Sequence, residues 1–213
     1  MFKYILQWKI RTNHSNAIDI FDKVSGMHKE NGAEFTTLGV LTGADNGSFA
    51  ISVNFKNYES YGLMDDAWNN SNGKWDQIIE PNLGSDTQLI ETMYMRKIVG
   101  NIDGPNDKLS VWSVWVFECD DQQAVMDSFE IDWKHYNSNG CTGLNIMSTS
   151  GADYPRPNQY VFAARFDSMT QLGKHFDKTM ENNNYWNEIR DYHSKIKIIK
   201  NYNLRVLKRQ INN

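Results

Sequence analysis

Residues Tyr4 to Arg11 read YILQWKIR, and apart from Ile5 this stretch has the apolar/polar alternation of a β-strand. A helical pattern follows over residues 16–31, where apolar side chains recur three and four positions apart, and Gly32 is a natural helix stop. The rest of this half predicts a strand, a hairpin turn, a strand, a helix interrupted near its middle and a last strand, over residues 35–41, 45–47, 49–55, 58–79 and 88–98.

The same order of elements recurs in the second half of the 213-residue chain, where they are predicted over residues 111–118, 122–137, 143–149, 159–166, 169–193 and 196–207. Single residues recur as well, and an identical residue follows 107 or 111 positions after each of Trp8, Ala17, His28, Gly62, Asp66 and Trp75. Small loop insertions explain the drift in offset. The sequence therefore predicts two copies of a β-α-β-β-α-β unit, at 1–98 and 109–213, joined by a turn-rich linker at 99–108.

Each copy has the order of a ferredoxin-like unit, which makes the predicted fold class α+β with antiparallel sheets. In topology and length the chain resembles the dimeric α/β-barrel superfamily, in a version with two units on one chain. Members include antibiotic-biosynthesis monooxygenases, NIPSNAP-like proteins, EthD-like proteins and the chlorite-dismutase group. The resemblance implies two sheets that face each other as an intrachain barrel. It also implies a cofactor-independent monooxygenase or isomerase-like activity on a small organic substrate.

Strand alternation separates an apolar face, expected to pack on the helices, from a mixed face. We expect the mixed face to line the space between the two sheets, either as a hydrogen-bonded surface or as a ligand cavity. A guanidinium group binds carboxylates bidentately, so a small anionic or carbonyl-bearing ligand would suit this face. The predicted substrate-binding residues are Arg11, Arg96, Arg165, Arg205, Asn54, Tyr94 and Trp112.

Three histidines are the candidates for proton transfer, because imidazole titrates near neutrality. His28 and His135 occupy equivalent positions near the ends of the first helix of each copy, while His175 replaces Met64 of the first copy. The alternative is that they are half-buried, hydrogen-bonded core residues. In heme-binding members of the superfamily an axial histidine comes from the region of His175. No motif supports that role here, so we expect no cofactor and no metal.

Two cysteines, Cys119 and Cys141, are predicted to be free thiols, because a helix crosses between them and places them at opposite ends of the sheet. Phosphate-binding glycine loops, the nucleophile elbow of hydrolases and paired catalytic carboxylates are missing from the sequence. These absences argue against nucleotide-dependent dehydrogenases, kinases and serine hydrolases.

The net charge of −4 and the lack of a long apolar run argue against nucleic-acid and membrane partners. The RNA-recognition motif shares this topology, but neither copy has its basic, glycine-containing third strand. We therefore expect a cytoplasmic protein with a small organic ligand, and a homodimer is compatible with this interpretation. Two functions stay open: a small-molecule enzyme, or a non-catalytic binding protein of the same fold.

Overall fold

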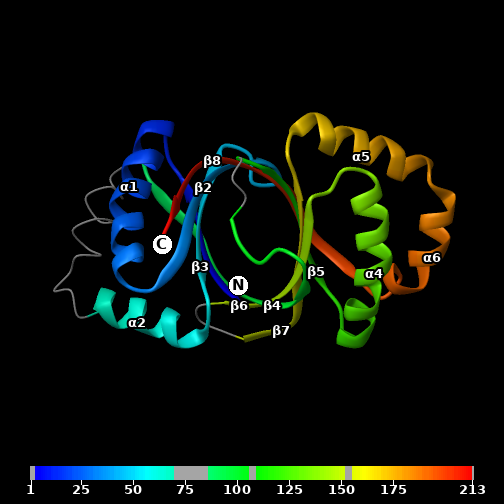
Figure 1. Ribbon diagram of the computed structural model, residues 1–213, viewed down its shortest axis with the longest axis horizontal. Coiled ribbons are helices and arrows are strands. Elements are labelled where there is room, and N and C mark those ends of the chain that lie inside the picture. The colour runs from blue at the N-terminus through cyan, green and yellow to red at the C-terminus, as the bar shows by residue number, and fades with distance from the viewer. Residues whose placement is uncertain (1–2, 70–85, 106–108, 152–154, 213) are drawn as a thin grey trace. The chain divides into compact units, whose positions relative to one another are not determined.

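The computed structural model describes residues 3–69, 86–105, 109–151 and 155–212 (Figure 1). In the first half the elements are β1 (Tyr4–Arg11), α1 (His14–Glu30), β2 (Ala33–Gly43), β3 (Ser48–Phe55), α2 (Tyr58–Asn69) and β4 (Gln88–Gly100). In the second half they are β5 (Val111–Glu118), α4 (Gln122–Ser138), β6 (Gly143–Gly151), β7 (Pro155–Phe166), α5 (Met169–Glu181), α6 (Asn183–His193) and β8 (Lys197–Ile211). The predicted order of elements is confirmed in both halves.

The strands form antiparallel pairs, and their hydrogen-bonded order β1-β3-β2-β8-β5-β7-β6-β4 closes on itself as a barrel. This arrangement confirms the predicted α+β class. Both first helices end in the same way, because Gly32 and Gly140 follow α1 and α4 with φ angles of 87° and 92°. A side chain would be strained in that conformation, so each glycine lets the chain turn back into the next strand.

By internal contacts the chain forms two compact units. Unit 1 comprises Met1–Met95, Asp103–Pro105 and Val206–Asn213, and unit 2 comprises Arg96–Ile102 and Asn106–Arg205. The strands β4 and β8 therefore each contribute to both units. The predicted boundaries of the two copies, at 1–98 and 109–213, describe a repeat in the sequence and not these compact units. They stay a prediction.

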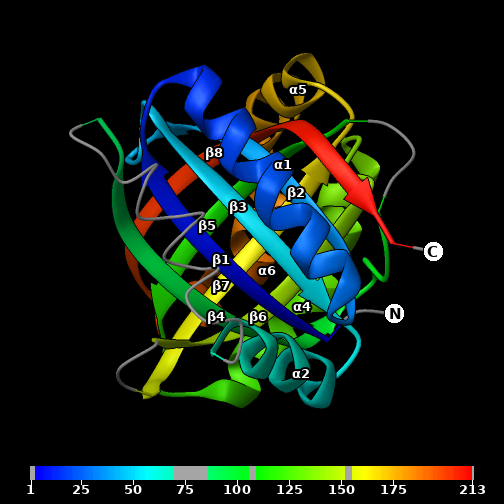
Figure 2. The same cartoon turned by 90° about the vertical axis from the view of Figure 1, so that its left-hand side faces the viewer.

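In unit 1, α1 lies across β2 and β3 (Figure 2). One set of alternating strand residues, which includes Trp8 and Phe55, packs against Ile20 and Phe21 of α1 and Met64 of α2. The helix-facing side of β1 and β3 is thus the apolar set that the sequence predicted. The predicted continuation of this helical segment over residues 70–79, with Trp75, lies outside the described residues.

In unit 2, the helices α4, α5 and α6 cover one side of the β5 and β7 strands (Figure 1). The predicted single helix over 169–193 is wrong in one respect, because it is two helices that meet at Asn182. The Asn182 backbone N–H ends α5 at the Thr179 carbonyl, while its side chain accepts a hydrogen bond from Tyr185 N and starts α6. The asparagine is a strong helix N-cap, which the helical periodicity alone does not reveal.

Both cysteines are free and buried, as predicted. Cys119 N donates to Asn158 O at one end of β7, whereas Thr142 N, next to Cys141, donates to Arg165 O at the other end. The two cysteines therefore lie toward opposite ends of β7, as the sequence predicted. No described helix is long and apolar enough to cross a bilayer.

Candidate functional site

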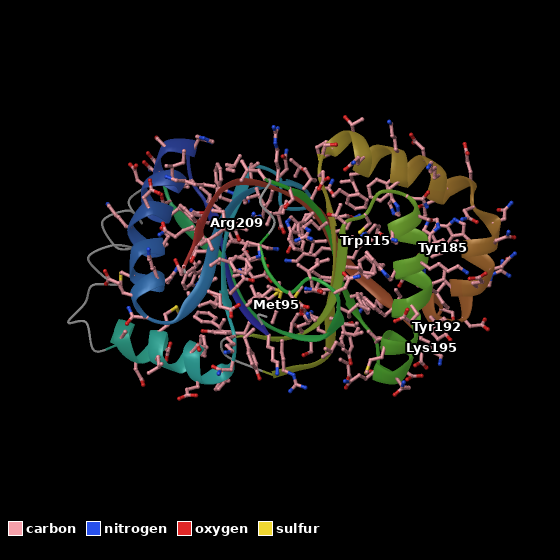
Figure 3. The ribbon with its side chains drawn as sticks, in the orientation of Figure 1. Met95, Trp115, Tyr185, Tyr192, Lys195 and Arg209 are labelled. Atoms are coloured by element: carbon pink, nitrogen blue, oxygen red, sulfur yellow. The ribbon has the colours of Figure 1, made fainter. Side chains whose placement is uncertain are left out.

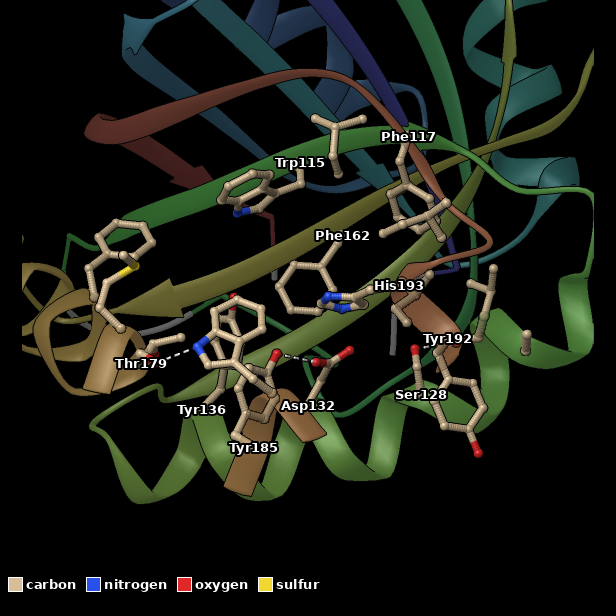
Figure 4. A pocket seen from close by; sticks show the side chains of 18 residues that line it. Trp115, Phe117, Ser128, Asp132, Tyr136, Phe162, Thr179, Tyr185, Tyr192 and His193 are labelled. Atoms are coloured by element: carbon tan, nitrogen blue, oxygen red, sulfur yellow. Dashed lines mark hydrogen bonds between the residues drawn. The ribbon is translucent and has the colours of Figure 1, made fainter. Parts of the chain in front are cut away.

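A cavity of about 340 Å³ lies in unit 2, between the helix-facing side of its sheet and the helices α4, α5 and α6 (Figure 4). Eight of its lining residues are phenylalanine, tyrosine or tryptophan, and they come from the sheet and from all three helices. None of its eighteen lining residues is a lysine or an arginine. Its volume falls at the lower end of the range for small-molecule sites.

The sheet supplies an aromatic wall. Trp115 and Phe117 point to the helices because they share one face of β5, and Trp115 pairs with Phe162 of β7 in the antiparallel register. Residues directly opposite each other in such a register share a face, so the three rings lie together. The indole nitrogen of Trp115 donates to Ser113 Oγ at 3.2 Å, which fixes the ring on the strand. Figure 3 shows Trp115 on the sheet and Tyr185 among the helices.

The helix α4 supplies the polar part of the wall. Val125, Ser128, Asp132 and Tyr136 line the cavity at helical spacing, so they follow one stripe of the helix. Ser128 satisfies its own hydroxyl by donating to Val125 O at 3.0 Å. Asp132 is the only acidic residue in the lining, and its side chain is 3 % exposed.

Asp132 forms a pair with Tyr185 of α6. The tyrosine hydroxyl donates to Asp132 Oδ1 at 2.7 Å (Figure 4). Burial disfavours the charged carboxylate and raises the pKa of Asp132 to about 7, although the hydrogen bonds from Tyr185 and Ser128 oppose that rise. Burial together with the nearby Asp132 raises the pKa of Tyr185, which keeps the phenol protonated. The cavity therefore holds a carboxyl group that exists in both forms near neutral pH.

The junction of α5 and α6 forms the open side of the cavity. Thr179 ends α5 within the lining, and Trp186 Nε1 donates to its carbonyl oxygen at 2.8 Å. Met180 and Trp186 also line the cavity and are exposed. Ile198 of β8 also lines the cavity and is exposed, so a ligand would first meet side chains from both the helices and the sheet.

The predicted catalytic histidines lie outside the lining of this cavity. His135 is directly behind it, since its ring stacks on Tyr185 and its Nε2 is 2.8 Å from Thr179 Oγ1. His175 is fully buried, and burial together with His135 lowers its pKa to about 4. In unit 1, His28 stacks on Trp8, and burial lowers its pKa to about 3. A catalytic role for these three residues stays a prediction.

The predicted arginine anchors do not line this cavity either. Arg11, Arg96 and Arg205 are exposed. Arg165 is half-buried and donates to Thr142 O at 3.2 Å, and its guanidinium carbon lies 6.0 Å from the ring of Trp112. Their predicted role as anion anchors is untested by this geometry.

The predicted face is wrong for the last strand of each copy. Tyr94 of β4 packs against Tyr61 of α2, with ring centroids 5.3 Å apart, so it lies on the helix side. Arg205 of β8 pairs with Val111, which faces the helices. The mixed face is correct for Asn54, which is buried and donates to Phe35 O at 3.4 Å. On β4 and β8 both faces are partly buried, so alternation alone does not say which face is which.

The sequence analysis missed Asp132, Tyr185, Thr179 and His193 as candidates for the site. A signal was present for Asp132, because an acidic residue interrupts the apolar stripe of the helix predicted at 122–137. For Tyr185 and Thr179 the decisive feature is the helix break at Asn182. Among the described residues, no cluster of histidine, cysteine, aspartate and glutamate has the geometry to hold a metal ion.

Solved structures resemble this chain over nearly its whole length. An anthrone oxidase-like protein has a TM-score of 0.60 at 8 % identity and covers 99 % of this chain and 94 % of its own. A candidate monooxygenase from Fusobacterium nucleatum subsp. nucleatum ATCC 25586 has a TM-score of 0.60 at 10 % identity, covering 100 % and 96 %. A heme complex of a DypB variant from Rhodococcus jostii RHA1 has a TM-score of 0.57 at 10 % identity, covering 97 % and 94 %.

These likenesses confirm the predicted dimeric α/β-barrel fold, and at such low identity they establish the fold alone. No family model and no curated protein matches the sequence. The lining of the unit 2 cavity does not fit heme, since it holds no lysine or arginine for the two propionates.

Proposed function

We propose, from the shared fold and the cavity of unit 2, that the chain binds a small uncharged aromatic molecule there and moves a proton to or from it through Asp132. The observation that carries this proposal is the pair of Asp132 and Tyr185 in a cavity that is lined mainly by apolar and aromatic side chains. Without a lysine or arginine in the lining, an anionic ligand would lose its hydration with no compensating charge.

Asp132 suits general acid–base work because catalysis is most efficient when the pKa of the group lies near the working pH. The pKa of about 7 leaves part of the population ionised and able to accept a proton. The Tyr185 hydroxyl, 2.7 Å away, stabilises the ionised form by donating to it. Aromatic walls on the sheet and on the helices would hold a flat molecule between them.

Removal of a proton from an activated carbon is the first step of two reactions. Return of the proton at another atom is an isomerisation, whereas attack of the resulting carbanion on O₂ is a cofactor-independent oxygenation. The likeness to a candidate monooxygenase and to an anthrone oxidase-like protein favours the second reaction.

Anthrone is a direct probe for that reaction. Asp132 would take a proton from its methylene carbon, and the carbanion would add O₂ to give a peroxide anion. Return of the proton from Asp132 would make this anion a hydroperoxide, and loss of water would then give anthraquinone. We expect the protein to accelerate anthraquinone formation in air-saturated buffer, and we expect Asp132→Asn to abolish the acceleration. Asp127→Asn is the matched control, because Asp127 is exposed on the same helix. A rate equal to that of buffer for the wild-type protein contradicts the oxygenase proposal.

A second candidate is a binding protein without catalysis. It is favoured by one observation, namely that Asp132 and Tyr185 already satisfy each other without a ligand. Quenching of tryptophan fluorescence by 1-naphthol measures binding independently of turnover. Binding that persists in both the wild-type protein and the Asp132→Asn variant, with no turnover in either, supports this second function.

A further inference from the structure

We propose that His135 is a positioning residue that keeps the Tyr185 hydroxyl aimed at Asp132. This inference rests on the proposed function, since it takes Asp132 and Tyr185 as the reactive pair. His135 lies on α4, and it contacts the end of α5, the junction residue Asn182 and the first turn of α6. It therefore joins the helical segments that form the wall of the cavity.

The hydrogen bonds around Nδ1 of His135 make that nitrogen an acceptor. Asn182 presents its amide nitrogen to Nδ1 at 3.3 Å, and its orientation is fixed because its oxygen accepts from Tyr185 N. Asn139 presents its amide nitrogen to Nδ1 at 3.4 Å, and the same nitrogen donates to His135 O at 2.9 Å. Two donors meet at Nδ1, so this nitrogen carries no proton.

The other ring nitrogen is then the donor. Thr179 Oγ1 gives its single proton to His175 O at 2.8 Å, so it accepts from His135 Nε2–H, also at 2.8 Å. His135 is thus neutral and protonated at Nε2. Burial lowers the pKa of His135, which agrees with this neutral state. A second proton would place Nδ1–H against two amide donors and release Asn182.

Tyr185 is held at both its backbone and its ring by this arrangement. Its backbone N–H is capped by Asn182, whose amide rests on His135. Its ring stacks on the imidazole with centroids 3.9 Å apart and an interplanar angle of 13°. With both ends fixed, the hydroxyl has one direction, and it reaches Asp132 Oδ1 at 2.7 Å.

The test measures the titration of Asp132 by ¹³C NMR of labelled aspartate carboxyl groups in the full chain without ligand. Tyr185→Phe removes a hydrogen bond to the carboxylate, so the midpoint should rise by about one pH unit. His135→Ala should raise it by a similar amount. The double variant should match Tyr185→Phe alone, because His135 acts through the tyrosine. Should His135→Ala fail to fold, His135→Gln takes its place, since glutamine keeps a donor and an acceptor but has no ring to stack.

Ser138→Ala is the matched control, because Ser138 donates to the backbone carbonyl oxygen of His135 at 2.8 Å and this bond does not involve the imidazole ring. It should leave the midpoint unchanged. A folded His135 variant with an unchanged or lowered midpoint overturns the proposal, since a merely structural histidine would at most admit water and ease ionisation. Additive shifts in the double variant also overturn it. The readout needs no substrate, so it stands apart from the anthrone experiment.

Discussion

The environments of His28 in unit 1 and His135 in unit 2 are two versions of the same repeated position. In unit 1, His28 stacks on Trp8 of β1 with centroids 5.5 Å apart, and this tryptophan belongs to the core. In unit 2, His135 stacks instead on Tyr185, and Trp115, the counterpart of Trp8, lines the cavity. The histidine ring therefore stacks on a residue of the sheet in unit 1 and on a residue of a neighbouring helix in unit 2.

A second exchange accompanies the first. Ser25 stands one turn before His28, and Asp132 stands at the same place before His135, and both are buried. A serine hydroxyl can donate a hydrogen bond to a carbonyl oxygen of its own helix, as Ser25 does to Asp22 O. A buried carboxyl group needs a donor from another element, and Tyr185 supplies it for Asp132. Unit 2 thus has a buried carboxyl group paired with a tyrosine at a position where unit 1 has a buried serine bonded to its own helix.

The largest expected effect on turnover comes from replacing Asp132 by serine, the residue that unit 1 has at the equivalent position. Asp132→Ser should lower the turnover of any proton-transfer substrate about 10²- to 10⁴-fold, because it removes the general base. Steady-state kinetics with anthrone measure this. Asp127→Ser on the exposed face of α4 should leave the rate unchanged, and equal rates for wild type and Asp132→Ser would contradict the role of Asp132.

The reverse change should damage unit 1. Ser25→Asp places a carboxyl group at a buried position of α1, where the native serine donates to Asp22 O of its own helix. We expect a loss of about 3 kcal/mol in the free energy of unfolding, measured with urea. Ser25→Ala should cost less than about 1 kcal/mol. Equal costs for the two variants would show that the site tolerates a carboxyl group.

The pH dependence of stability should carry the signature of Asp132. The pKa is raised from 3.8 to about 7 by folding, so the native state holds the proton more tightly than the unfolded chain. This contribution is complete below pH 4 and is lost as the pH rises to 7. Relative to Asp132→Asn, the wild-type free energy of unfolding should fall by about 1.4 kcal/mol per pH unit across that window. A constant difference would contradict the raised pKa.

The smallest expected effect is the difference between alanine variants of two helix N-cap residues. Asn13 and Asn182 cap α1 and α6 in the same way, each accepting a backbone N–H three residues ahead. Replacement by alanine should cost about 1 kcal/mol of stability at either position. Only Asn182→Ala should also raise the titration midpoint of Asp132, because only that cap holds Tyr185. A shift caused by Asn13→Ala would point to a global effect.

The repeat and the apolar faces of β1, β3, β5 and β7 could be predicted from the sequence, because each of these strands has one apolar and one mixed set of residues. The helix-facing side of β8 could not be predicted in this way. Its buried residues Tyr202 and Leu204 lie on one face, whereas Asn203 and Arg205 share the face of Val111, which packs on the helices. Alternation relates residues within one strand, and only the register with a neighbour assigns the face.

The cavity itself could not be predicted, because it depends on how far α5 and α6 stand from the sheet and on their break at Asn182. The sequence analysis placed the candidate site on the opposite side of the sheet, because the polar strand residues lie on the mixed face. The sequence signal that does point to this cavity is the charged residue within the apolar stripe of a helix, because a buried carboxyl group needs a specific partner, and Asp132 has one in Tyr185.

The most direct measurement of the central claim is the ¹³C NMR titration of the Asp132 carboxyl group, assigned by its loss in Asp132→Asn, with and without saturating 1-naphthol. The account predicts a midpoint near pH 7 in the free protein and a change of the Asp132 signal on addition of 1-naphthol. A midpoint near 4 with no response to 1-naphthol would contradict a buried proton-transfer group in this cavity.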